Sequence, residues 1–137
     1  MQNFPFVSLP HALIVLRVAI AVFFMAHASV RMVNGSIPGF GQFLEARHIP
    51  FGLAVVWLIT AQEIIGGFLL ALGLKVRWVT LGFQAICWGG IAIIHAKLGW
   101  FVGEHGTGGV EYSLCLSVAL LVLAAADREG YFVRKRK

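Results

Sequence analysis

Charged residues are scarce in this sequence of 137 residues, of which only 12% are Asp, Glu, Lys or Arg while 59% are hydrophobic. Soluble chains typically contain about 25% charged and about 45–50% apolar residues. A soluble domain of this length has too little interior to bury so much apolar surface. The composition therefore excludes a soluble protein and predicts the lipid bilayer as the surrounding medium.

Cysteine and acidic residues are also few. Cys87 and Cys115 lie in separate apolar runs and form no C-x-x-C pair, so neither a dithiol redox centre nor a zinc knuckle is predicted. The net charge is +5, but five of the eleven Lys and Arg lie between residues 127 and 137, directly after an apolar run. This placement is typical of a membrane flank that faces anionic headgroups, and nucleic acid is not predicted as a partner.

Long apolar runs make up most of the chain, at about residues 11–33, 51–73, 76–97 and 110–126. A helix of about 17–25 residues crosses the hydrocarbon core of a bilayer. The first run has no Lys or Arg before Arg17, so it lacks the basic segment of a signal peptide. We interpret all four runs as retained transmembrane helices.

The connection over residues 34–50 is predicted to contain a short amphipathic helix at the membrane surface, because Phe40, Phe43 and Leu44 give it an apolar edge. The predicted fold is an all-α integral membrane protein, a four-transmembrane-helix bundle with this interfacial helix between its first and second helices. We expect residues 1–137 to form a single membrane domain that ends in a basic tail over residues 127–137.

Lys and Arg are distributed unequally between the two sides of this bundle. Both termini and the turn at residues 74–78 share one side, which holds Lys75, Arg77 and the basic tail, whereas the opposite side has only three basic residues. Because positive loops stay in the cytoplasm, the sequence predicts a multi-pass protein with both termini cytoplasmic.

A single carboxylate, Glu63, lies near the middle of the second apolar run. A carboxylate at this depth costs several kcal/mol if it faces lipid, so Glu63 is expected to face the bundle interior and to meet a partner. Gly66 and Gly67 follow on or near the same helical face. They would let another helix approach closely beside Glu63.

Other polar side chains occur near the ends of the spans. The third run has a polar stripe of Thr80, Gln84, Cys87, Trp88 and His95, which is predicted to face the interior. His27, His95 and Glu111 approach one membrane face, with Glu63 about 10–15 Å below them. We expect these side chains to surround a polar pocket whose floor is Glu63, while Arg17 and Arg31 extend to the membrane surfaces as anchors.

Three interpretations of this pocket are open. His27, His95, Glu63 and Glu111 are candidate metal ligands, but the sequence has no Glu-x-x-His pair of the kind that bundle di-iron sites use, so a metal is the least favoured. A quinone or another small ligand could accept a hydrogen bond from a histidine while a carboxylate relays protons. Alternatively, the His and Glu side chains form a structural hydrogen-bonded network.

Four segments of the chain, in order, resemble motifs of the DoxX family. The family's first-helix motif of Arg, His and a basic residue resembles LRVAIAVFFMAHASVRMVNG, and its second-helix Glu-x-x-Gly-Gly motif resembles QEIIGGFLLALGLKVRW. The third-helix His and the loop motif of Gly before Glu-Tyr are similar to IAIIHAKLGWF and GTGGVEYSLCL. The resemblance covers about residues 12–132 and departs at AADREGYF, where the family has a Gly-Pro-Gly-like turn.

The resemblance implies a four-helix bundle in the bacterial inner membrane, and a subunit of, or accessory to, a redox system that is quinone-linked or responds to oxidative stress. Quinone is then the implied cofactor, and a redox protein the implied partner. The positions that the resemblance singles out are Arg17, His27, Glu63, His95, Glu111 and Tyr112. No catalytic motif is present, so no specific reaction is predicted. Two alternatives stay open: a non-enzymatic scaffold or assembly protein, and a small-solute or proton passage, which would require a homo-oligomer.

Overall fold

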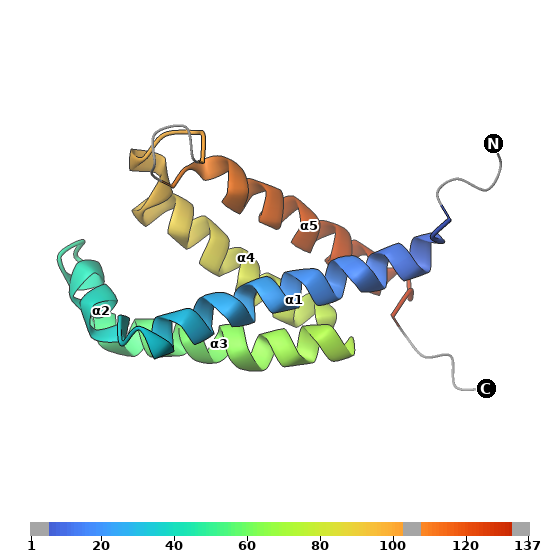
Figure 1. Cartoon of the computed structure of the whole chain (residues 1–137), viewed down its shortest axis with the longest axis horizontal. Coiled ribbons are helices and arrows are strands. Elements are labelled where there is room, and N and C mark those ends of the chain that lie inside the picture. Colours follow the sequence, from blue (N-terminus) through green and yellow to red (C-terminus); the bar gives the residue numbers. More distant parts are fainter. Residues whose placement is uncertain (1–5, 103–107, 133–137) are drawn as a thin grey trace.

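A computed structural model describes residues 6–102 and 108–132, and every regular element within these ranges is helical. In chain order they are α1 (Leu9–Val33), α2 (Ile37–Glu45), α3 (Gly52–Leu72), α4 (Val76–Ile93), the short 3-10 helix η1 (His95–Lys97) and α5 (Val110–Arg128) (Figure 1). Four segments are long and apolar enough to cross a membrane: Leu9–Val33, Gly52–Leu72, Val76–Lys97 and Val110–Arg128. The predicted four-helix membrane fold is thereby confirmed, whereas the last four basic residues of the tail lie outside the described residues.

The four long helices form two pairs that diverge like the arms of a V (Figure 1). α1 packs along α3 in one arm and α4 packs along α5 in the other, and the arms meet near the turn from α3 to α4. Apolar side chains from all four helices are buried where the arms meet. There the rings of Phe24 from α1 and Phe83 from α4 stack in parallel, with centroids 4.0 Å apart.

Close helix packing within the first arm depends on Gly67. A Cβ atom added at Gly67 would collide with the Met25 side chain and would lie 3.3 Å from the Ala21 carbonyl oxygen of α1. The predicted close approach beside Glu63 is confirmed, because a side chain at Gly67 would force the Met25 side chain to move.

The short helix α2 lies against the first half of α3. Its buried Ile37 and Leu44 pack with Val56 of α3 in a second apolar cluster. After α2, the Glu45 Oε1 atom accepts a hydrogen bond of 3.1 Å from the Gly52 N–H, one of the free donors at the start of α3. The predicted short helix between the first two spans is thus present, and it is held against α3 by apolar packing and this hydrogen bond.

One sequence expectation about α4 was wrong. Thr80 and Cys87 of the predicted polar stripe are buried as expected, but the Trp88 side chain is exposed on the outside of the bundle. Its indole is amphipathic, with a large apolar ring surface that suits contact with lipid. Because Trp88 was grouped with the polar residues, the sequence predicted a wider interior-facing surface on α4 than the structure has.

Candidate functional site

Glu63 meets its partner from α1, where Arg31 lies directly opposite it. The Arg31 Nη1 atom is 2.7 Å from Glu63 Oε2, and Nη2 is 3.4 Å from Oε1. The same Nη1 donates to Thr60 Oγ1 at 2.9 Å, and the Thr60 hydroxyl donates in turn to the Val56 carbonyl at 2.8 Å. The Glu63 side chain is only 3% exposed and that of Arg31 only 13%. The pair therefore forms a forked, charge-assisted contact inside the bundle.

The expectation that Arg31 extends to the membrane surface as an anchor was wrong. A buried carboxylate is tolerated when a well-placed cation neutralises it, and the long Arg31 side chain turns inward to do so. The sequence did contain a signal, because His27 and Arg31 are four residues apart and share one face of α1. His27 also lies close enough to Glu63 to interact with it electrostatically.

A pocket of about 770 Å³ lies between the two arms and includes this ion pair in its wall. Residues of α1, α2, α3, α4, η1 and α5 all contribute to the lining, which is mostly apolar or glycine. The ionisable or amide side chains in the lining are His27, Arg31, Gln62, Glu63, Cys87, His95 and Tyr112. A mostly apolar cavity with a few convergent polar groups is the usual form of a small-molecule site.

The sequence candidates are the six positions that the resemblance singled out and Gln84 of the polar stripe. The structure brings four of these seven to the pocket, namely His27, Glu63, His95 and Tyr112. Glu111 is not part of the lining, since its Oε1 accepts a hydrogen bond of 2.8 Å from the Val102 N–H. Gln84 faces α5 and donates through Nε2 to the Ser117 carbonyl at 2.7 Å. Arg17 lies near the turn after α3 instead, at the end of the molecule where the arms meet.

His95 contributes an imidazole ring to the pocket wall. Its Nδ1 atom is buried and has no hydrogen-bond partner within the described residues. A buried polar atom without a partner costs about 1–3 kcal/mol. The Nε2 side of the ring lies near Gly90, another lining residue, so Nε2 is the nitrogen that a ligand in the pocket would approach.

A metal cage has no geometric support in the part of the chain that the structure describes. No three His, Cys, Asp or Glu side chains come close enough there to hold a metal ion together. At Glu63 the ion pair gives the physical reason, because the carboxylate that would bind a metal ion is already paired with Arg31.

Arg47 joins the two arms at the edge of the pocket, and sequence reasoning missed this role. Its Nη1 donates to the Ile93 carbonyl at 3.0 Å, at the end of α4, and its guanidinium lies 4.8 Å from the Phe43 ring centroid. Ile93 and His95 both line the pocket. Arg47 therefore connects the segment after α2 to the pocket wall on the second arm.

Comparison with known proteins identifies the family of the chain. A family model described as DoxX matches residues 12–96 of the chain, a range that includes His27, Arg31, Glu63 and His95. No curated protein and no solved structure matches the chain.

Proposed function

The chain belongs to the DoxX family, and we propose that it is a quinone-binding subunit of, or accessory to, a membrane redox system. The observation that carries this proposal is the mostly apolar pocket of about 770 Å³ between the two arms, whose lining includes the His95 imidazole. His27 and Tyr112 line the same pocket and add two more polar groups to it.

The lining has the chemistry that a quinone ring requires. The ring is flat and apolar and has two carbonyl oxygens that accept hydrogen bonds, so it needs apolar walls and a few N–H or O–H donors. The side chains of His27, His95 and Tyr112 would hold it through such bonds. A bound quinone supplies the acceptance and release of electrons together with protons.

The redox partner has to be another protein in this proposal. The sequence contains neither a haem-attachment motif nor a cysteine cluster, and Cys87 and Cys115 are free thiols. The chain itself would bind the quinone, orient it and hold it in the bilayer, while electrons come from the partner.

Binding of soluble quinones to the purified protein tests this proposal. We expect ubiquinone-1 to raise the thermal unfolding temperature in a saturable manner, and His95→Phe to remove most of that increase. His11→Phe is the matched control, because His11 is exposed near the start of α1 and does not line the pocket. Absence of a saturable effect in the wild type, or an equal effect in His95→Phe, would contradict the proposal.

The second candidate function is a non-enzymatic scaffold or assembly protein, and the ion pair favours it. Arg31, Glu63 and Thr60 satisfy one another directly, as expected of a network that fixes α1 against α3. In that case Glu63→Gln lowers thermal stability, while no quinone changes the unfolding temperature of any variant.

A further inference from the structure

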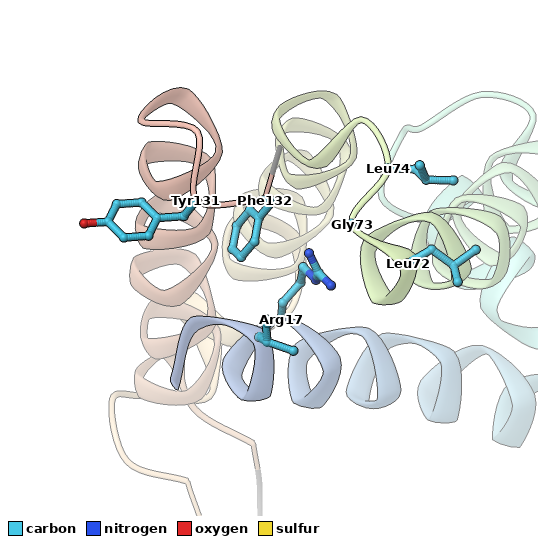
Figure 2. A pocket seen from close by; sticks show the side chains of 7 residues that line it. Arg17, Leu72, Gly73, Leu74, Tyr131 and Phe132 are labelled. Carbon is cyan, nitrogen blue, oxygen red and sulfur yellow. The ribbon is translucent and has the colours of Figure 1, made fainter. Parts of the chain in front are cut away.

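A second cleft, with a volume of about 600 Å³, lies at the end of the molecule where the two arms meet. It is lined by Ile14 and Arg17 of α1, by residues 72–74 after α3, and by Tyr131 and Phe132 after α5. Figure 2 shows the Arg17 side chain extending from α1 into the space between Gly73 and Phe132. This cleft is separate from the pocket proposed for the quinone, and the two share no lining residue.

The Arg17 guanidinium in this cleft has unused hydrogen-bonding capacity. The residue is only 9% exposed, and its Nη2 donates to the Ala71 carbonyl at 3.2 Å. Its Cζ atom lies 4.7 Å from the Phe132 ring centroid. The Nε atom is buried and has no hydrogen-bond partner within the described residues. A guanidinium has five N–H donors, so donors on Nη1 and Nη2 also have no partner among the described residues and are available to an anion.

The charge balance around the cleft is positive. Asp127 interacts electrostatically with Arg17, but its Oδ2 is already paired with Arg77 Nε at 3.2 Å. Lys75 adds an exposed positive charge in the turn between α3 and α4. Among the described charged residues that line the cleft or lie within a few residues of its lining, Arg17, Lys75, Arg77 and Arg128 outnumber Asp127 and Glu129. An anion that approaches Arg17 therefore meets net attraction.

The length of α3 indicates that the cleft lies near the depth of the lipid headgroups. The 21 residues of α3 span about 30 Å at about 1.5 Å per residue, so the end of α3 at Leu72 reaches the boundary of the hydrocarbon core. Arg17 approaches Gly73, the next residue, so closely that a Cβ atom there would collide with its guanidinium. The adjacent Leu72 side chain is 69% exposed and provides an apolar surface toward the lipid.

We propose that this cleft binds one anionic phospholipid, with its phosphate on the Arg17 guanidinium and its acyl chains against Ile14, Leu72 and Leu74. Guanidinium groups pair with phosphate through two parallel hydrogen bonds. Basic residues at a membrane boundary also attract anionic lipid. A lipid that enters sideways from the bilayer meets both the cation and the apolar wall, whereas a free phosphate would use only the cation.

Lipid titration of the purified full chain in neutral detergent tests the proposal. Phosphatidylglycerol is compared with phosphatidylcholine of the same acyl chains, with the thermal unfolding temperature and native mass spectrometry as readouts. We expect one phosphatidylglycerol to be retained and to stabilise the wild type, with binding about tenfold weaker in Arg17→Gln because a charge-assisted contact is lost. Lys97→Gln, which removes an exposed charge at the opposite end of the bundle, should retain most of the effect.

Three outcomes would overturn the proposal. Equal phosphatidylglycerol binding by the wild type and Arg17→Gln would show that the cleft is not used. Equal losses in Lys97→Gln and Arg17→Gln would indicate general surface charge, and equal stabilisation by inorganic phosphate would indicate a free anion site.

A second pair of variants keeps the test decisive if Arg17→Gln does not fold. Leu74→Glu places a carboxylate at the cleft while Arg17 is kept, and it should abolish selective phosphatidylglycerol retention. Leu74→Gln loses the same apolar contact without adding a charge, so it is the control and should retain clearly more phosphatidylglycerol than Leu74→Glu. Retention that is the same in both variants would contradict the proposal.

Discussion

Arg31 and Glu63 lie 2.7 Å apart across the contact between α1 and α3, and this ion pair forms part of the wall of the larger pocket. It fixes the register of the first arm, because the two side chains can meet only when α1 and α3 are correctly aligned. The pair also keeps the two charges within the protein, away from the lipid that surrounds the bundle.

Removing one member of this pair should be costly, and removing both should be much less so. Breaking a buried ion pair costs about 3–5 kcal/mol because the remaining charge is left without a partner. We expect Arg31→Met to lower the free energy of unfolding by about this amount, and Arg31→Met with Glu63→Leu to recover most of it. Reversible unfolding in detergent measures both. Single and double variants that are equally stable would contradict the pairing.

The stacked rings of Phe24 and Phe83 hold the two arms together. Phe83 is fully buried, and replacing such a residue with Ala costs about 3–5 kcal/mol. Phe83→Ala should therefore lower the unfolding temperature strongly. Phe68→Ala is the matched control, because Phe68 is exposed on the outside of α3 and its replacement should have little effect on the contacts between helices. Similar losses in both variants would argue against the observed meeting of the arms.

Gly67 should not tolerate a larger residue. A branched side chain would collide with Met25 of α1, and overpacking typically costs about 1–3 kcal/mol. We expect Gly67→Val to destabilise the protein. At Gly89 the space around an added Cβ is open, and Gly89→Ala should be neutral or stabilising by up to about 1 kcal/mol. Thermal unfolding of the two variants checks the contrast, and a tolerated Gly67→Val would show that α1 and α3 are farther apart.

The contact between Arg47 and Ile93 should limit access to the pocket. Cys87 lines the pocket and is buried, so its rate of alkylation by a small maleimide reports how often the arms separate. In a Cys115→Ser background, Arg47→Ala should increase that rate several-fold, whereas Arg77→Ala, at the other end of the bundle, should not. An unchanged rate in Arg47→Ala would show that this contact does not control access.

The number and type of the transmembrane helices were predictable because they depend on long apolar runs, which lipid requires and soluble folds lack. The inward position of Glu63 was predictable for the same reason. The identity of its partner was not, because a long Arg side chain can extend to the membrane surface or turn inward, and only the relative alignment of α1 and α3 decides between the two.

The distribution of the other polar residues depends on contacts that a helical wheel does not contain. Glu111 bonds to the Val102 N–H and Gln84 to the Ser117 carbonyl, so neither lines the pocket. Both choices depend on which free backbone groups lie nearby in three dimensions. The role of Arg47 escaped prediction for the same reason, since its acceptor belongs to the end of α4, forty-six residues further along the chain.

Photolabelling with a light-activated azidoquinone tests the central claim most directly, because it reports where a quinone binds in the membrane-embedded protein. We predict covalent labels on peptides that contain residues 23–31, 55–63 and 82–95, with labelling suppressed by excess unlabelled quinone and reduced in His95→Phe. Labels confined to outward-facing positions such as Trp57, Phe68 and Trp78, without competition by unlabelled quinone, would contradict the account.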